Sequence, residues 1–174
     1  MPETAPSTDR RFDVAVVGAG PAGLAAAALL AEEGFSTVLL APPSRPDDVR
    51  TTALLGGSIP FLKRLGILEA IEAAGAPLAT MRLVDATDRL IRAPEATFHA
   101  REIGLSSFGV NIVNRDLTRI LDEKIAASPT LARIEAAVTA VRPLADRIEL
   151  VTASGETVTA RLAVAADGKG SRLR

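Results

Sequence analysis

The apolar positions near the start of the chain predict a strand, a helix and a second strand. Residues 12–17 form a short, almost continuous apolar run that ends at a glycine, the pattern of a strand buried on both faces of a parallel sheet. Residues 21–33 are rich in alanine and leucine, begin with Pro21 and are followed by Gly34, which predicts a helix. Residues 36–41 are a second apolar run, so the whole segment predicts a β-α-β unit.

The middle of the chain predicts shorter elements separated by loops. Proline and charge are dense in residues 42–50, which predicts a loop. Further on, Leu117, Ile120, Leu121 and Ile125 recur at helical spacing. The expected helices span residues 53–65, 67–74 and 116–127, and the expected short strands span residues 81–85, 90–93, 97–99 and 110–113.

The last third of the chain predicts mainly strands. Apolar and polar residues alternate there, and turn-like segments at 144–146 and 154–156 separate the runs. The expected strands span residues 132–137, 139–143, 147–153, 157–161 and 162–166. The pattern as a whole predicts an α/β fold in which a small antiparallel sheet accompanies a parallel one.

The composition excludes most kinds of reactive site. The chain has 174 residues, which suits one domain with a substantial core. It has no cysteine, which removes disulfides, thiolate nucleophiles, zinc–thiolate sites and iron–sulfur clusters. Its single histidine, His99, makes a Ser-His-Asp triad or a histidine-rich metal site hard to build. We therefore nominate no catalytic residue and no metal ligand, and we expect a borrowed cofactor.

The charge and the start of the chain narrow the class of partner. The 20 Lys and Arg residues balance 21 Asp and Glu residues, which argues against nucleic-acid binding. Residues 1–10 are polar and lack the apolar region of a secretory signal, so we expect a disordered tail. The longest apolar run, residues 24–31, is far shorter than the roughly 20 residues of a membrane-spanning helix. We expect a cytoplasmic protein.

A glycine-rich loop between the first strand and the first helix predicts dinucleotide binding. Gly18, Gly20 and Gly23 fit the pattern G-x-G-x-x-G. The first glycine permits the tight turn, the second lets backbone approach a pyrophosphate, and the third lets the helix pack on the strand. The helix start, at Pro21 and Ala22, presents N–H groups and the positive end of the helix dipole to phosphates. These five residues are the candidate pyrophosphate site.

One part of the dinucleotide pattern is missing. An acidic residue usually ends the second strand and binds the ribose hydroxyls, but Ala41 occupies that place here. The nearest acids are Asp47 and Asp48, in the following loop. Either another group binds the ribose, or the affinity for the nucleotide is weakened.

Three further segments resemble parts of the flavin-dependent aromatic hydroxylases. Residues 48–58, DVRTTALLGGS, with LKRLG at 62–66, resemble the segment after the second strand in that family. Residues 114–117, NRDL, with Leu121, resemble the start of a family helix with the pattern R-x-x-L. Residues 166–174, ADGKGSRLR, resemble the family's D-G-x-x-S-x-x-R segment.

The resemblance implies FAD contacts for four residues outside the glycine loop. Arg50 would lie along the FAD, and Arg115 would contact it from the start of a helix. Asp167 and Gly168 would approach the FAD pyrophosphate, and their segment is also implicated in the use of NAD(P)H. On the residues alone, the two arginines are more typical of solvated surface charges, and Asp167 is compatible with a turn or N-cap residue.

The resemblance also implies the fold and its division. It predicts a doubly wound, Rossmann-like FAD-binding domain with an antiparallel β crossover and part of a substrate-side β-region. Residues 11–77 would form the FAD-binding β-α-β unit and the following helices, residues 78–110 the substrate-side part, and residues 111–174 the return to the FAD domain. Family members continue well beyond the D-G motif, so we expect the N-terminal FAD-binding fragment of a longer enzyme.

The implied function is that of an FAD-dependent monooxygenase that hydroxylates an aromatic ring with NAD(P)H as co-substrate and O2. The phrase RTTALLGGS followed by FLKRLG is most similar to the ubiquinone-biosynthesis hydroxylases, whose small-molecule substrate is a prenylated aromatic precursor. Such a substrate would bring the enzyme to the inner face of a membrane as a peripheral protein. Two alternatives stay open: another FAD oxidoreductase of this fold, of halogenase or reductase type, and a non-catalytic nucleotide-binding remnant.

Overall fold

The computed structural model describes residues 10–43, 48–171 and 173, and these form two compact units. Unit 1 comprises residues 1–47 and 118–174, and unit 2 comprises residues 48–117. The functional division expected at residues 77 and 110 stays a prediction. The disordered tail expected for residues 1–10 lies outside the described residues, except for Arg10, which begins the first strand.

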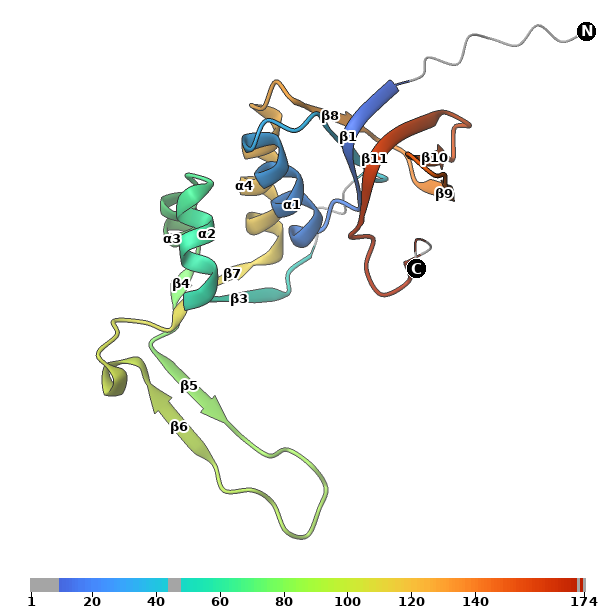
Figure 1. Ribbon diagram of the computed structural model, residues 1–174. Coiled ribbons are helices and arrows are strands. Elements are labelled where there is room, and N and C mark those ends of the chain that lie inside the picture. Colours follow the sequence, from blue (N-terminus) through green and yellow to red (C-terminus); the bar gives the residue numbers. More distant parts are fainter. Residues whose placement is uncertain (1–9, 44–47, 172, 174) are drawn as a thin grey trace, which may run out of the picture. The chain divides into compact units, whose positions relative to one another are not determined.

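Unit 1 is built on a six-stranded sheet with the strand order β8-β2-β1-β11-β10-β9 (Figure 1). Strands β8, β2, β1 and β11 pair in parallel, while β10 pairs antiparallel to β11 and to β9. The parallel half of this sheet is the predicted β-α-β arrangement, and the antiparallel half is the predicted crossover. The strands are β1 (Arg10–Val17), β2 (Thr37–Leu40), β8 (Leu131–Ile134), β9 (Val138–Pro143), β10 (Ile148–Thr152) and β11 (Thr157–Ala165).

Both faces of the two central parallel strands are buried, over residues 14–17 of β1 and 37–40 of β2. In β1, Ala15 and Val17 belong to a core cluster that includes Leu150 of β10 and Val158 of β11. Val16 is equally buried and points to the opposite face, because side chains alternate along a strand. This double burial explains why residues 14–17 of β1 are all apolar.

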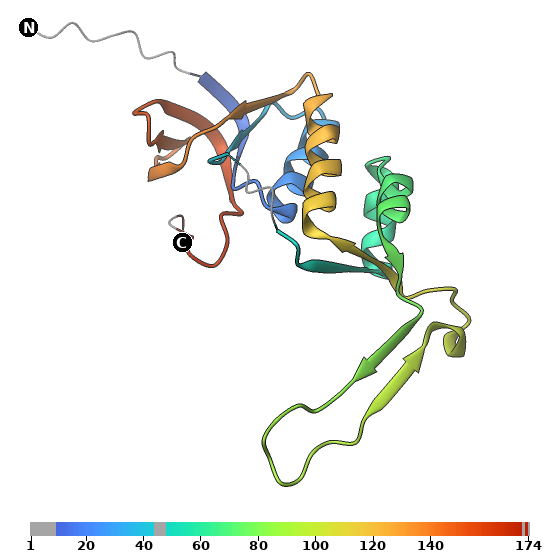
Figure 2. The same cartoon turned by 180° about the vertical axis from the view of Figure 1, so that it is seen from behind.

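Helix α1 (Pro21–Glu32) packs on β1 and β2, and helix α4 (Asn114–Ala126) runs beside it in both ribbon views (Figures 1 and 2). Residues of α4 from Thr118 onward belong to unit 1. There, Lys124 forms an ion pair with Glu32 of α1 at 2.5 Å. The hydroxyl of Thr130 also donates to the carbonyl of Ala31 at 3.0 Å, so the end of α1 is bonded to the segment after α4.

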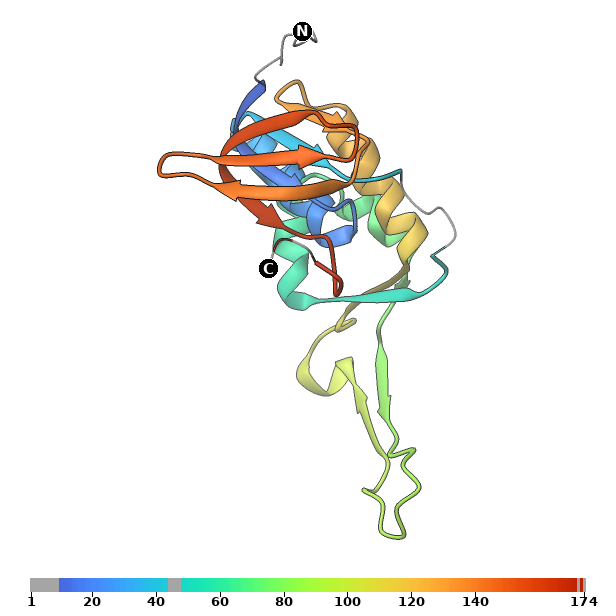
Figure 3. The ribbon, with the colours of Figure 1, turned by 90° about the vertical axis from the view of Figure 1, so that its right-hand side faces the viewer.

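Unit 2 contains two small antiparallel sheets and two short helices. Its three-stranded sheet has the order β3-β7-β4, from β3 (Thr51–Leu55), β7 (Gly109–Val113) and β4 (Ala76–Pro77). The helices are α2 (Ile59–Arg64) and α3 (Leu68–Ala74). Strands β5 (Thr80–Leu83) and β6 (Ala96–His99) form a separate hairpin, visible as a long ribbon in Figure 3. Short 3₁₀ turns occupy Gly56–Ser58 and Ala100–Ile103.

Three predicted elements were wrong. Residues 53–55 are the end of β3 rather than the start of a helix, because they pair with β7. Residues 90–93 form no strand; Leu90 and Ile91 are exposed and pair with no neighbour in the described hairpin. Residues 157–161 and 162–166 form one strand, β11, because β10 pairs with its first part and β1 extends beside nearly all of it.

The remaining predicted elements differ from the structure by a few residues at their ends, whereas β4 and the two 3₁₀ turns were not predicted. Helix α4 starts at Asn114, two residues before the predicted Asp116, and β1 starts at Arg10. Within the described part of the chain, no helix has both the length and the apolar character that crossing a membrane requires.

Candidate functional site

The glycine loop of unit 1 turns sharply at the end of β1. Gly18 follows Val17 with a φ of +111°, a conformation that side chains with a Cβ rarely adopt. Its backbone N–H donates to the carbonyl of Leu40 at 2.8 Å, which ties the loop to the end of β2. A Cβ at Gly18 would also collide with the backbone of Ala166. The local fold therefore requires glycine at this position.

The other two glycines of the loop differ sharply from each other. A Cβ at Gly23 would overlap the carbonyl of Gly18 and crowd the side chain of Ala166, so Gly23 is required for the close packing of α1 on the loop. A Cβ at Gly20 would meet nothing within 4 Å, and the backbone there is ordinary extended chain with a φ of −74°. The protein itself thus gives no reason for glycine at position 20, whereas a ligand approaching the backbone would.

The first turn of α1 suits an anionic group. Gly20 is the N-cap of α1, so no side chain caps the helix start. Pro21 occupies the first turn, which contains no acidic residue. The N–H groups at a helix start have no partner within the helix, and the helix dipole makes this end positive. The loop and helix start thus form a cradle of the kind that a pyrophosphate fits.

The end of β11 lies against the same loop. The N–H of Ala166 donates to the carbonyl of Val17 at 2.8 Å, so the chain after β11 leaves the sheet beside the chain after β1. Asp167 is exposed there, and Gly168 turns with a φ of +86°. Unit 1 therefore brings together two candidate groups that are more than 140 residues apart in sequence: the glycine loop and the D-G segment.

Ala41 offers no ribose ligand. It follows β2, is 4% exposed, and its N–H donates to the carbonyl of Ile134 at 3.2 Å. A methyl group packed in this way cannot accept a hydrogen bond. Of the two nearby acids, Asp47 lies outside the described residues, and Asp48 belongs to unit 2.

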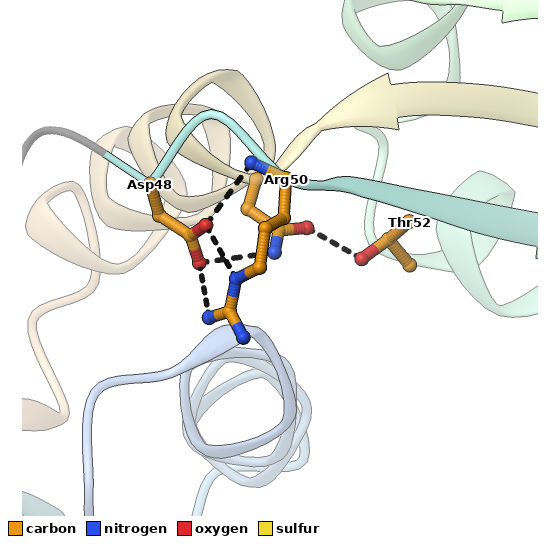
Figure 4. Close-up of polar contacts among 4 residues, drawn as sticks. Asp48, Arg50 and Thr52 are labelled. Carbon is orange, nitrogen blue, oxygen red and sulfur yellow. Dashed lines mark hydrogen bonds and ion pairs between the residues drawn. The ribbon is translucent and has the colours of Figure 1, made fainter.

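In unit 2, Arg50 belongs to a chain of four polar side chains at the start of β3 (Figure 4). Its Nε and Nη2 donate to the two carboxylate oxygens of Asp48 at 2.8 and 2.7 Å. Asn114 donates its amide N–H to Asp48 at 3.0 Å. The amide oxygen of Asn114 accepts from the hydroxyl of Thr52 at 2.5 Å.

Charge keeps this network in one protonation state. The hydrogen bonds from the Arg50 guanidinium, and then from the Asn114 amide, hold the pKa of the Asp48 carboxyl far below its ordinary value. The Asp48 carboxylate in turn raises the pKa of Arg50. Both groups therefore stay charged across the physiological range.

Arg115 takes part in the same region mainly through its backbone. Its N–H donates to the carbonyl of Asp48 at 3.1 Å, and the N–H of Asn114 donates to the carbonyl of Arg50 at 2.8 Å. The Arg115 side chain is more than half exposed and has a loose ion pair with Asp116 at 3.8 Å. The start of α4 thus holds the loop that carries Arg50.

Sequence reasoning named the two arginines but did not predict that Asp48 pairs with Arg50, or that Asn114 and Thr52 complete the network. The spacing of Asp48 and Arg50 was a usable signal, because two residues apart in extended chain lie on one face. The contact between Asp48 and Asn114 joins positions 66 apart, and no spacing rule predicts it. The five glycine-loop residues with Asp167 and Gly168 lie in unit 1, and the two arginines lie in unit 2.

Other chemistry is scarce among the described residues. They contain no group of histidine, cysteine, aspartate or glutamate side chains that could hold a metal ion. The ring Nδ1 of His99 lies 3.1 Å from the hydroxyl of Thr80 across the β5–β6 hairpin. A cavity of about 410 Å³ lies at the start of β1, near Asp13 and Arg161, whereas the glycine loop follows the end of that strand.

Comparison with known proteins identifies the relatives of this chain. Residues 11–174 match the family model described as an FAD binding domain. The chain is 28% identical to the ubiquinone hydroxylase UbiL of Rhodospirillum rubrum and 30% identical to the ubiquinone hydroxylase UbiM of Neisseria meningitidis. These alignments cover 97% and 93% of the chain but only 40% and 37% of the relatives. The chain therefore spans about two fifths of their length.

Solved structures share the fold. The p-nitrophenol 4-monooxygenase PnpA of Pseudomonas putida superposes with a TM-score of 0.79 at 20% identity, over 95% of this chain and 43% of that one. The flavin-dependent monooxygenase PieE, solved with FAD and substrate, superposes with a TM-score of 0.72 at 24% identity, over 97% and 32%. The predicted α/β fold with its antiparallel crossover is confirmed.

Proposed function

The chain belongs to the FAD-binding-domain family, and on that premise we propose that it binds FAD as the nucleotide-binding part of an aromatic-ring monooxygenase. The observation that carries the proposal is the contrast within the glycine loop. Gly18 and Gly23 are required by the fold, whereas Gly20 faces open space, where only a ligand would demand the absence of a side chain. The loop with the start of α1 is then the site for the FAD pyrophosphate.

Each candidate residue has a distinct part in this proposal. Gly18 and Gly23 shape the turn, and Gly20 lets the backbone approach the phosphates. Pro21 sets the helix start without consuming an N–H, and Ala22 offers its N–H in the first turn. Asp167 and Gly168 border the loop from the end of β11 and close the site on that side.

Arg50 and Arg115 are the remaining residues that we propose to contact FAD. A guanidinium presents several N–H donors in a plane, which suits the phosphate oxygens or the carbonyl groups of a flavin ring. Arg50 is held ready by Asp48, and its side chain is 81% exposed. The network leaves the cationic group accessible and fixed in direction.

Bound FAD would supply the redox and oxygen chemistry, with NADH or NADPH as the source of electrons. Absence of cysteine and the small number of candidate catalytic groups fit this division of labour. The relatives UbiL and UbiM favour a prenylated aromatic compound of ubiquinone synthesis as the substrate. A substrate of that kind would bring the enzyme to a membrane surface as a peripheral protein.

The flavin-dependent halogenase CmlS, with a TM-score of 0.72 at 26% identity, keeps a second FAD chemistry open. A non-catalytic remnant is the other alternative, and Ala41 in place of the ribose acid favours it. The purified chain separates these possibilities. We expect it to retain or take up a yellow flavin that chromatography identifies as FAD, and to bleach when NADH or NADPH is added without oxygen. A folded chain that takes up no flavin would refute the proposal and favour the remnant.

A further inference from the structure

We propose that Asp48, oriented by Asn114 and Thr52, is the positioning residue that holds the Arg50 guanidinium in one orientation for FAD binding. This inference rests on the proposed FAD site and assigns a role to three residues beyond the glycine loop and the two arginines. It concerns unit 2 alone, where all four side chains lie.

The geometry of the pair leaves one edge of Arg50 for a ligand. The two bonds to Asp48 use Nε and Nη2, which together form one edge of the planar guanidinium. Nη1, with its two N–H groups, lies outside this pair. Since a two-bond contact fixes the plane of the guanidinium, it also fixes the direction in which Nη1 points.

The carboxylate is itself held in place. One oxygen of Asp48 accepts from Nδ2 of Asn114, and Oδ1 of Asn114 accepts from the hydroxyl of Thr52. This second bond sets which end of the amide faces Asp48. The backbone N–H of Arg50 donates to the same carboxylate at 3.1 Å. Besides the guanidinium, two donors therefore hold the Asp48 carboxylate: the Asn114 amide, itself oriented by Thr52, and the backbone N–H of Arg50.

A second arginine pair in unit 2 has the same two-bond geometry without such supporting bonds. Arg82 donates to Glu95 through Nε and Nη2 at 2.5 and 2.7 Å, and its side chain is 65% exposed. Among the described residues, Glu95 receives side-chain hydrogen bonds from Arg82 alone. Exposed pairs contribute little to folding free energy. The extra bonds at Asp48 therefore serve orientation, and the Arg82–Glu95 pair is a matched control.

The test compares the dissociation constant of FAD for the wild-type chain with those of Asp48→Asn, Arg50→Ala, the double variant and the control Glu95→Gln. We expect Asp48→Asn to weaken binding roughly tenfold and Glu95→Gln to leave it unchanged. The double variant should bind no more weakly than Arg50→Ala, because Asp48 acts through Arg50. Additive losses, or no loss for Asp48→Asn, would overturn the assignment. Equal unfolding temperatures of Asp48→Asn and Glu95→Gln exclude a merely structural effect.

A measurement without FAD separates this inference from the proposed function. NMR relaxation of the Arg50 Nε–H group reports its order in the chain alone. We expect the Arg50 group to be rigid in the wild type and mobile in Asp48→Asn and in Asn114→Ala. Equal order in the wild type and both variants would overturn the positioning role, whether or not the chain binds FAD. Failure of the wild type to bind FAD would instead refute the proposed function.

Discussion

The glycine loop of unit 1 depends on its backbone conformation, whereas the arginine network of unit 2 depends on side-chain hydrogen bonds. The loop is made of backbone, and its conformation is enforced by contacts too close for a side chain at Gly18 or Gly23. The network is made of side chains that reach one another across 66 residues of sequence. Both regions offer donors to an anion, but only the first is inseparable from the fold.

This difference teaches how binding and stability are divided in the chain. A change at Gly18 or Gly23 alters the packing of β1, α1 and the end of β11 together. A change at Asp48 or Arg50 alters an ion pair whose arginine side chain is 81% exposed, so we expect the fold to tolerate its removal. Gly20 is the exception in the loop, since its position is open.

The largest expected effect is a loss of stability on adding one methyl group to the loop. Gly23→Ala and Gly18→Ala should each lower the free energy of unfolding by about 2–4 kcal/mol, through backbone collision and, at Gly18, positive φ. Urea unfolding measures the change. Gly34→Ala is the control, because its φ is also positive but its Cβ would meet nothing within 4 Å. A loss at Gly18→Ala no larger than that at Gly34→Ala would show that positive φ, and not collision, accounts for it. A Gly23→Ala variant as stable as the wild type would contradict the collision at that position.

The next effect separates binding from folding inside the loop. Gly20→Leu should change the free energy of unfolding by less than about 1 kcal/mol, since its Cβ faces open space. The same change should weaken FAD binding by roughly 100-fold or more, a cost of about 2.7 kcal/mol, by blocking approach to the backbone. Calorimetry and urea unfolding on the same sample give both values. Unchanged affinity would contradict the placement of the pyrophosphate.

The pH dependence of the network is the third test. The folded-state pKa of Asp48 is lowered, so the pair with Arg50 is present at and above the ordinary carboxyl pKa and is lost only when the pH falls through the lower folded value. NMR titration of the Asp48 carboxyl carbon should therefore show no step between pH 7 and pH 4. In Arg50→Ala the step should move up toward the ordinary carboxyl value. A wild-type step near the ordinary value would show that the pair does not form in solution.

The smallest expected effect concerns a charge pair in unit 1. Lys124 and Glu32 join α4 to α1 at 2.5 Å, and both side chains are 30% exposed. Glu32→Gln should lower the free energy of unfolding by no more than about 1 kcal/mol, because water screens a partly exposed pair. FAD affinity should not change. A larger loss would mean that charge, as well as backbone packing, secures unit 1.

Much of unit 1 could be predicted from the sequence because its signals are local. Within residues 12–33, an apolar run predicts a strand, three glycines predict a tight turn, and an alanine-rich segment predicts a helix. The helix predicted for residues 53–55 was wrong because these residues form a strand by pairing with β7, more than fifty positions away. The hydrogen bond from Asn114 to Asp48 was likewise not predictable, because it also joins distant positions of the chain. Long-range pairing decides such elements, and local patterns do not record it.

The central claim, that this chain binds FAD through the glycine loop, is tested most directly by titrating FAD into the purified wild-type chain and into Gly20→Leu. We predict saturable, one-to-one binding to the wild type and binding at least roughly 100-fold weaker for the variant, with both chains equally folded by circular dichroism. Equal FAD affinity of the two folded chains, or no FAD binding by the wild type, would contradict it.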